Sequence, residues 1–584
     1  MQSWLRRKPI DQLTEHEEGR RLIPTLSWPH LVALGIGAIV GTGIYTLIGV
    51  GADKAGPAVL LSFIIAGVVC ACAALAYAEL STMMPAAGSA YTYSYSALGE
   101  TIAWVVGWSL LLEYSLVVST VAVGWSGYFV GFLEWVHTQF GWNVMLPQAL
   151  AAGPHVEGGF LNLPAIVITF LVAGMLMVGT RESATVNAVL VVFKLIALAI
   201  FVAVALPAFD PANLQPFMPY GFPKSISADG VERGVMAAAA IIFFAFYGFD
   251  AISTAAEETK NPGRDLSIGI VGSMIGCTLI YLVVALAAVG AMNYTVFGKS
   301  AEPLALIMRE LGHGTAALVI GVVAIIALPT VLLAFFYGQS RIFFVMSRDG
   351  LLPRGLSLVN KRTGTPVTIT VFTAVLVAAL AGVARLDEIA ALANAGTLAA
   401  FTAVGLCLLV LRKREPGRVR RFRTPLAWLV GPVAIGGCIY LFFSLPAATQ
   451  KWFSIWNLLG WTVLIWYSRK KSMLAQSGVT DGFNAYLGGG KGLFATCWLW
   501  GVIPSLVAGS IIGGLNLVGA HPPLVMVYVL WTGYLIAWIP AMWNAAKAYS
   551  GPTIWANLGQ VWAVLTALSI PFYLFILLLS STPR

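Results

Sequence analysis

The chain has 584 residues, of which 59% are hydrophobic and 10% are charged, whereas an ordinary soluble domain has about 25% charged residues. This composition excludes a water-soluble globular protein, and the mean hydropathy of +0.84 indicates a polytopic helical membrane protein. The net charge is +9, and we expect the basic residues that produce it in the loops that flank membrane spans. The six cysteines show no metal-site spacing, so we expect no metal, no cofactor and no nucleic-acid partner.

Apolar windows of about 20 residues, the length that crosses a bilayer as a helix, recur along the whole chain. Fifteen windows predict fifteen spans: 28–51, 57–81, 93–130, 161–179, 184–206, 234–258, 266–291, 315–346, 366–384, 388–411, 426–446, 452–468, 496–516, 523–543 and 556–580. If the N-terminus is cytoplasmic, 25 of the 34 Lys and Arg residues fall in inside segments and 8 in outside segments. The positive-inside rule therefore predicts a cytoplasmic N-terminus and, from the odd number of spans, an external C-terminus.

Two spans carry residues that interrupt a helix near mid-membrane. Span one contains the glycine-rich stretch GIGAIVGTGIY (35–45), and each glycine destabilises a helix by roughly 1 kcal/mol relative to alanine. In span six, Gly248 and Asp250 interrupt an apolar run. Matching interruptions in two halves indicate a transporter site, because unwound backbone at membrane depth survives only around a cavity. Close helix packing through small residues is the alternative explanation for span one.

Span six follows span one after five spans, and this odd offset inverts the second unit relative to the first. The predicted repeat covers 28–206 and 234–411. A helix broken at mid-depth exposes amides that attract anions and carbonyls that attract cations. The pattern fits a zwitterion whose carboxylate is bound by the amides of Gly41, Thr42 and Gly43. Its ammonium group is bound by the carbonyls of Phe244, Ala245 and Tyr247.

Seven segments resemble those of one transporter family: GIGAIVGTGIY (35–45), AGPAVLLSF (55–63), YAELSTMMPAAGSAYTYSYSALGE (77–100), GWSLLLEY (107–114), VNAVLVVFKL (186–195), FYGFDAISTAAEETKNPGRDLSIGI (246–270) and GQSRIFFVMSRDGLLP (338–353). On these segments the chain resembles the amino acid–polyamine–organocation superfamily, closest to the cationic amino acid transporter group and its bacterial homologues. The resemblance implies an all-α polytopic membrane protein with a five-plus-five inverted repeat, discontinuous spans one and six, and alternating access. It also implies main-chain recognition of an amino acid at the two breaks, with Ile39 among the site residues.

Lys194 lies about ten residues into span five, roughly 15 Å from its start by helical rise. A lysine at that depth is costly unless it is paired, neutral or hydrated, which makes it a candidate proton carrier; a structural lysine bonded to helix carbonyls is the alternative. The resemblance supports the proton-coupling role and places Lys194 against span one near Ile39 and Val40 and against span eight.

Glu113 lies mid-depth in span three, and the resemblance places it at the binding site. Its expected partner is Lys194, a water molecule or the substrate amine, and a hydrogen-bonded core carboxyl is the alternative. We hypothesise that Glu113 and Lys194 form a coupled proton relay.

Several further residues are candidates for gating or for helix ends. The resemblance nominates Phe244 as the extracellular thin gate. Asp250 is expected to cap the lower half of span six. Glu79, together with Glu257 and Glu258 beside Lys260 and Arg264, suits an inside gate of ion pairs, although a helix-end role is equally consistent. The resemblance implies that Arg341, Arg348 and Asp349 order the loop after span eight.

The predicted organisation is a cytoplasmic tail (1–27), a transport core (28–411), spans eleven and twelve (412–471) and additional helices of unknown role (472–584). The last segment contains a glycine-rich hinge (488–492) that leads to three further apolar spans, which could form a homo-oligomer contact, a lipid-facing support or a docking surface for a small membrane partner.

The sequence therefore predicts a secondary active amino acid transporter of the cell membrane that works as a proton-coupled symporter, with amino acids, protons and lipid as its partners. An amino acid exchanger and a non-transporting sensor are the alternatives. No GxxxxGK[ST] motif occurs, which argues against an ATP-driven pump, and no enzymatic constellation is evident. The sequence leaves the substrate side chain open, because the mid-depth residues other than Glu113 are mostly apolar.

Overall fold

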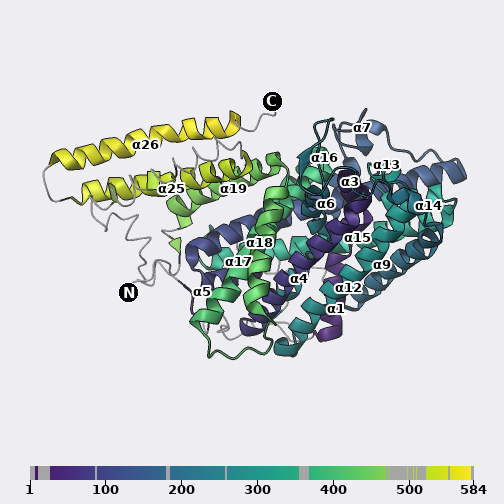
Figure 1. Cartoon of the computed structure of the whole chain (residues 1–584), viewed down its shortest axis with the longest axis horizontal. Helices are drawn as coiled ribbons and strands as arrows, with labels where there is room; N and C mark the ends of the chain where they lie inside the picture. The colour runs from purple at the N-terminus through teal and green to yellow at the C-terminus, as the bar shows by residue number, and fades with distance from the viewer. Residues whose placement is uncertain are drawn as a thin grey trace.

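The computed structural model is an assembly of helices with a single short hairpin in the part of the chain that it describes (Figure 1). It describes residues 7–10, 26–85, 88–178, 184–254, 256, 259–353, 367–468, 471–472, 496–497, 504–505, 508, 521–549 and 553–579. Within these residues, eight helices are long and apolar enough to cross a membrane, and three shorter apolar helices accompany them. The predicted all-α polytopic fold is confirmed.

Spans one and six are both interrupted, as predicted. Span one consists of α1 (Trp28–Ile39), the short α2 (Thr42–Tyr45) and α3 (Leu47–Ala55). Span six consists of α10 (Val235–Ile242), the 3-10 turn η5 (Phe243–Ala245) and α11 (Asp250–Thr254). Helical hydrogen bonding therefore stops in both spans near their middle.

The other spans of the core are continuous helices, and their order follows the predicted windows. They are α4 (Val59–Met83), α6 (Glu100–Phe140), α8 (Leu163–Val178), α9 (Ala184–Ala205), α12 (Pro262–Ala291), α15 (Gly314–Arg348), α16 (Val367–Val383) and α17 (Leu386–Arg414).

The contacts between helices are those expected if spans one to five and spans six to ten are two copies of one structural unit. In span one, α1 packs against α12 of span seven and α9 of span five. In span six, α10 packs against α4 of span two and α17 of span ten. Exchanging each span for the span five places away (one for six, five for ten and seven for two) converts the first pair of contacts into the second. The pairs α4 with α12, α6 with α15, and α8 with α16 join spans that are themselves five places apart.

The window 93–130 is not one span, which corrects the predicted boundaries. The structure divides it into α5 (Ser89–Ala97) and the 41-residue α6. Gly99 lies between them with φ of 105°, a left-handed conformation that favours glycine. A hydropathy window cannot detect this corner, because the apolar character continues on both sides of it.

Short elements cover the end of the bundle opposite α5. They are α7 (Gln148–Ala151), η2 (Gly56–Ala58), η3 (Leu206–Ala208), η4 (Pro211–Leu214), the hairpin of β1 (Ser225–Ile226) and β2 (Glu232–Arg233), α13 (Tyr294–Phe297) and α14 (Pro303–Glu310). The hairpin is antiparallel and pairs Ser225 with Arg233. Arg233 joins it to span one, because its guanidinium lies 3.6 Å from the carboxylate of Asp53.

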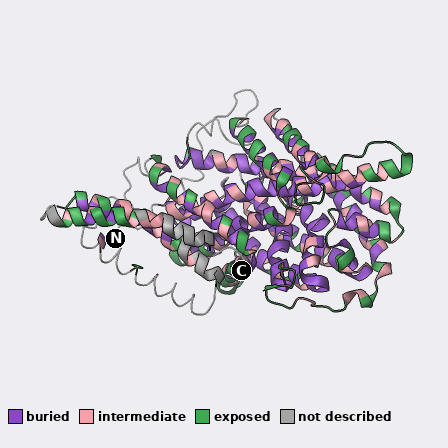
Figure 2. Ribbon diagram, turned by 90° about the horizontal axis from the view of Figure 1, so that it is seen from above, coloured by how far each residue is buried: buried purple, intermediate pink, exposed green. Residues whose placement is uncertain are grey.

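Buried residues fill the centre of the helical assembly and exposed residues lie on its outer helices (Figure 2). Among the exposed apolar side chains are Leu171 on α8, Phe193 on α9, Leu279 on α12 and Phe372 on α16. Apolar side chains that face outward on spanning helices are expected where lipid is the solvent.

The helices after the core pack on one another. Span eleven is α18 (Ala427–Ser444), which packs on α17, and span twelve is α19 (Ala447–Val463) with the π-helical segment η8 (Leu464–Ser468). The two last helices are α25 (His521–Lys547) and α26 (Thr553–Leu579). Figure 1 shows these two side by side, next to α19. The predicted span 496–516 and the glycine-rich hinge fall mostly or wholly outside the described residues, so the count of fifteen spans stays a prediction.

Candidate functional site

The two helix breaks touch each other in the middle of the core. A Cβ atom placed on Gly43 would lie 2.4 Å from the Cα of Ala245, so the backbones of spans one and six approach as closely as glycine permits. Gly248, with φ of 123°, faces the end of α1, where an added Cβ would lie 3.0 Å from the carbonyl carbon of Ala38. Glycine is needed at position 248 for its conformation and at position 43 for the approach.

The breaks leave some peptide groups without partners. Among the described residues, the amides of Gly41, Thr42 and Gly43 donate to no acceptor within hydrogen-bonding distance. In the same part of the chain, the carbonyls of Phe244, Ala245 and Tyr247 accept no hydrogen bond. These six groups are the ones that the sequence nominates for the carboxylate and the ammonium of a zwitterion.

Other peptide groups at the breaks are held by side chains from distant spans. The hydroxyl of Tyr281 on α12 donates to the Ile39 carbonyl at 2.8 Å. The hydroxyl of Tyr128 on α6 donates to the Tyr45 carbonyl at 2.6 Å. The amide of Asn394 on α17 donates to the carbonyls at the end of α10, 2.7 Å from Ala240 and 3.0 Å from Ile241. Buried backbone freed from a helix requires such partners.

Asn394, Tyr281 and Tyr128 are functional candidates that sequence reasoning missed. All three are buried. A lone amide such as Asn394 in an apolar span is a detectable signal, since polar groups at that depth need a partner. The two tyrosines give no such signal, because aromatic residues are common in membrane spans.

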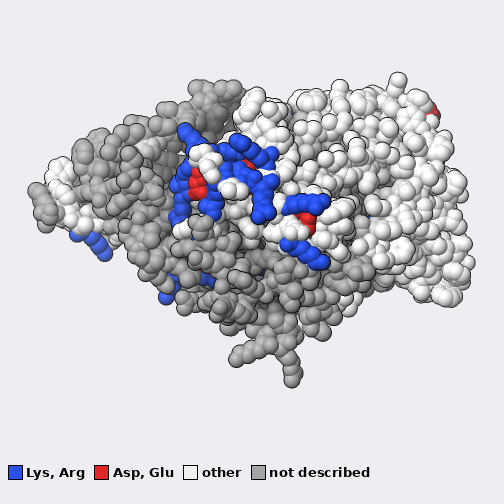
Figure 3. All heavy atoms as spheres, turned by 90° about the horizontal axis from the view of Figure 1, so that it is seen from below, with Lys and Arg blue, Asp and Glu red and all other residues white. Residues whose placement is uncertain are grey.

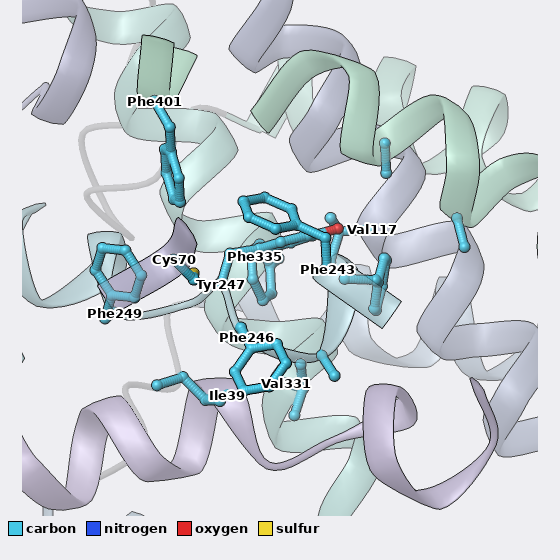
Figure 4. Close-up of a cluster of buried hydrophobic side chains, with 14 of the residues drawn as sticks. Ile39, Cys70, Val117, Phe243, Phe246, Tyr247, Phe249, Val331, Phe335 and Phe401 are labelled. Carbon is cyan, nitrogen blue, oxygen red and sulfur yellow. The ribbon is translucent and has the colours of Figure 1, made fainter. Parts of the chain in front are cut away.

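Aromatic side chains surround the break in span six. The ring of Phe244 packs edge-on against Tyr247 with centroids 5.0 Å apart, and Tyr247 contacts Phe335 of α15 at 6.4 Å. Figure 4 shows Tyr247 beside Phe335, with Ile39 and Val331 on the side of Phe246. Phe244 is 6% exposed. The described side chains around this break are therefore predominantly apolar.

Glu113 is a buried carboxylate without a hydrogen-bond partner among the described residues. It is 1% exposed, and neither of its oxygens is hydrogen-bonded. The hydroxyl of Tyr247 is buried and unbonded as well. Thr397 of α17 lies beside both side chains, and an added Cβ on the neighbouring Gly396 would lie 3.0 Å from the Cβ of Glu113. Within the described residues, spans three and ten thus enclose a carboxylate that has Thr397 beside it but no partner at good hydrogen-bonding geometry.

Lys194 lies between span one and span eight. Its ammonium donates to the Gly37 carbonyl at 2.9 Å and to the hydroxyl of Thr330 on α15 at 3.3 Å. The contact with span eight is as expected, but the carbonyl in span one is Gly37 and not Ile39 or Val40. Because Glu113 has no hydrogen-bond partner in the part of the chain that the structure describes, no direct bond joins it to Lys194. A relay between them would need an intervening group.

Asp250 stabilises the unwound segment of span six. One of its oxygens accepts from the Gly248 amide at 3.2 Å, and the other accepts from the Tyr114 hydroxyl at 2.7 Å. The carboxylate therefore holds the peptide two residues before α11 and links it to α6. Tyr114 also contacts span eight, because an added Cβ on Gly338 would lie 2.6 Å from its ring.

Glu79 belongs to a buried ion-pair cluster with Arg412 and Arg420, and its role in an inside gate stays a prediction. Its carboxylate accepts from Arg412 at 2.8 and 2.5 Å, from Arg420 at 3.0 Å and from the Thr424 amide at 2.8 Å. This cluster fastens α4 to the end of α17 and to the loop before α18. Glu257 and Glu258 lie outside the described residues.

Asp349 lies at the end of span eight, and its expected role in ordering the following loop stays a prediction, because residues 354–366 lie outside the described residues. Its carboxylate accepts from the Tyr91 hydroxyl at 2.8 Å and from the Lys8 ammonium at 3.1 Å. The guanidinium of Arg341 stacks 4.0 Å above the ring of Tyr337. Among the described residues, no cluster of His, Cys, Asp or Glu could hold a metal ion.

Two facing helix breaks within an inverted repeat are the structural mark of secondary transporters, and the sequence comparisons agree with it. The family model described as amino acid permease matches residues 26–468. The chain belongs to the amino acid permease family. It is a multi-pass membrane transporter and not an enzyme.

Three relatives illustrate the range of this family. The chain is 42% identical over 478 residues to the branched-chain amino acid permease BcaP of Bacillus subtilis (strain 168), covering 81% of this chain and 99% of the relative. It is 40% identical over 476 residues to the methylthioribose transporter of the same organism, with coverage of 81% and 100%. It is 37% identical over 424 residues to cationic amino acid transporter 3, mitochondrial, of Arabidopsis thaliana, with coverage of 71% and 67%. The helices α25 and α26 lie beyond the family match.

Proposed function

We propose that this permease is a proton-coupled amino acid symporter that works by alternating access. The observation that carries this proposal is the set of unpartnered peptide groups at the two breaks. Three amides of span one and three carbonyls of span six lie where the two backbones meet. An α-carboxylate and an α-ammonium group complement them in charge and in hydrogen-bonding capacity.

The proton-coupling part of the proposal concerns Lys194. Its ammonium bridges α1, which carries the break, and α15. A lysine that loses its proton keeps only weak bonds to both partners, so deprotonation would loosen span one from span eight. Protonation would favour the closed arrangement of these spans around the substrate. Inward release of the proton would then accompany inward release of the amino acid.

Glu113 and Phe244 complete the proposed site. The unbonded carboxylate of Glu113 can accept from the substrate amine or, through a water molecule, from Lys194. Phe244 packs on Tyr247 directly beside the break and would act as the outer gate. The apolar rings favour neutral side chains, whereas Glu113 would suit a cationic one, so we assign amino acids as the class and leave the side chain to measurement.

We also propose that the N-terminus and the end that carries α5 face the cytoplasm. The described basic residues concentrate at this end, as in the loop Lys413 to Arg423 (Figure 3). Protection of an N-terminal tag from added protease in sealed, right-side-out vesicles tests the orientation. Cleavage of that tag would contradict it.

Uptake into vesicles that contain the purified protein tests the function. We expect labelled leucine, arginine or both to accumulate when an inward proton gradient is imposed, and competition by each common amino acid and by methylthioribose to define the class. The variant Lys194→Ala should lose the dependence on the gradient, and Glu113→Gln should lose affinity. Unchanged pH dependence in both variants would contradict the coupling.

The alternatives give different results in the same assay. An exchanger transports labelled substrate only into vesicles preloaded with amino acid, whether or not a proton gradient is present. A sensor binds the amino acid without any flux. Either result would contradict symport while leaving the binding site at the breaks intact.

A further inference from the structure

Figure 3 shows a group of Lys and Arg side chains on one face of the molecule. The amide of Lys8 donates to the Tyr95 carbonyl at 3.4 Å, and Arg414 donates to the next two carbonyls, those of Ser96 and Ala97, so Arg7 lies close to Arg414. The Nε atom of Arg7 is buried and has no hydrogen-bond partner among the residues that the structure describes. Burial lowers the pKa of the Arg7 guanidinium below its ordinary value, and the nearby guanidinium of Arg414 lowers it further. Two guanidinium groups that approach each other repel unless an anion lies between them.

The described carboxylates near these two arginines are already bound by other groups, Asp349 by Lys8 and Glu100 by Tyr95. Arg414 lies at the end of α17 and donates to the carbonyls of Ala97 and Ser96 at 3.1 and 3.3 Å. Its acidic neighbour is Glu415, 3.6 Å away, and Glu415 is also bound by Arg418 at 3.2 Å. One carboxylate is therefore shared by two arginines, and Arg7 forms no ion pair with a carboxylate in the described part of the chain.

The loop that follows α17 adds further cations to this face. Lys413, Arg421 and Arg423 are exposed and form no ion pair with a described carboxylate. Arg421 lies against Gly263 in the first turn of α12. The loop is held in place because Arg412 and Arg420 bind the buried Glu79. A fixed group of cations beside the ends of several spans lies where lipid headgroups begin.

We propose that Arg7 and Arg414 bind the phosphate of an anionic phospholipid headgroup, with the loop Lys413 to Arg423 as the surrounding basic surface. Guanidinium groups bind phosphate through paired N–H donors, so one phosphate can join both arginines and fill the free Nε position. The lipid would then connect the N-terminal segment to span ten. That segment also contacts span eight through the Lys8 ion pair with Asp349, so the bound lipid favours the arrangement seen in this structure.

Titration of the full-length detergent-purified protein with short-chain phosphatidylglycerol tests the proposal. We expect saturable binding that short-chain phosphatidylcholine does not reproduce. Arg7→Gln and Arg414→Gln should each weaken it about fivefold, as expected for removing one basic residue near an anionic surface. Arg7→Lys should lose less than Arg7→Gln, because it keeps the charge. Lys299→Gln is the matched control, since Lys299 is exposed between α13 and α14 at the opposite end.

Binding of phosphatidylglycerol that both glutamine variants retain would overturn the proposal. So would competition by inorganic phosphate at equal concentration, because the site would then take a free anion. Arg7 lies outside every helix, so Arg7→Gln is not expected to disturb folding. A loss of binding in this variant with an unchanged melting temperature supports the assignment.

Discussion

Gly43 and Ala245 bring the backbones of spans one and six into contact, since a Cβ on Gly43 would lie 2.4 Å from the Cα of Ala245. This contact places the free amides of α2 opposite the free carbonyls of η5. The distance between the two sets of peptide groups is therefore set by the absence of a single side chain.

Replacing Gly43 with alanine should separate the two breaks. The added methyl group meets backbone atoms and cannot be accommodated by a side-chain rotation, and such overpacking costs about 1–3 kcal/mol. We expect substrate affinity to fall by about tenfold or more, as measured by equilibrium binding of a labelled amino acid.

Gly276→Ala provides the control for that experiment. Gly276 lies in α12, and an added Cβ there meets nothing within 4 Å, so this change should leave affinity unaltered. Equal affinity of Gly43→Ala and the wild-type protein would mean that the substrate binds elsewhere.

Removing the side-chain amide of Asn394 on α17 should destabilise the break in span six. Asn394→Ala leaves the carbonyls of Ala240 and Ile241 buried and unbonded, which costs about 1–3 kcal/mol. We expect a lower apparent melting temperature and reduced transport. Asn457→Ala is the comparison, because Asn457 bonds a carbonyl within the intact helix α19. If both variants behave alike, the amide has no special role at the break.

The positions of the breaks were predictable from sequence, whereas the side chains that support them were not. Glycines and an aspartate inside an apolar run mark a break through local chemistry alone. The partner of each freed carbonyl depends on which helices lie beside it. Asn394 is 154 residues from Ala240, and no local pattern reports that contact.

The same dependence on helix packing explains why Lys194 binds a different carbonyl of span one from those that were predicted. The family resemblance predicted a contact with span one near Ile39 and Val40, and the structure has a bond to Gly37 in that span. The carbonyl involved depends on the rotation and axial offset of α9 relative to α1, and Ile39 is occupied by Tyr281. The pairing of Glu79 with Arg412 and Arg420 likewise depends on how the loop after α17 folds back.

Neutralising Glu79 should destabilise the core, because it leaves Arg412 and Arg420 without their buried partner. Breaking a buried ion pair costs about 3–5 kcal/mol, so Glu79→Gln should lower the apparent melting temperature markedly. Glu388→Gln is the control, since the pair of Glu388 with Arg385 is exposed and such changes fall within about 0.5 kcal/mol. A gate that opens during transport would instead show altered rates with unchanged stability.

Glu302, in the turn before α14, should give the protein a pH-dependent stability. Burial raises the pKa of the Glu302 carboxyl, although Arg309 opposes the shift. In the unfolded chain a glutamate titrates at about pH 4.3. The pKa of Glu302 is higher in the folded protein, so the folded protein binds the proton more tightly. The contribution of Glu302 is therefore fully present below about pH 4.3 and is lost as the pH rises through the folded pKa.

Comparison with Glu302→Gln isolates this effect, because glutamine does not titrate. The stability of the wild-type protein minus that of the variant should fall as the pH rises from about 4 to 7, measured as apparent melting temperature. Asp229→Asn should show the opposite sign, since the hydrogen bond from Arg233 lowers the pKa of Asp229 and its contribution is lost as the pH falls. Parallel curves for the wild-type protein and Glu302→Gln would show that burial of this carboxyl has no linkage to folding.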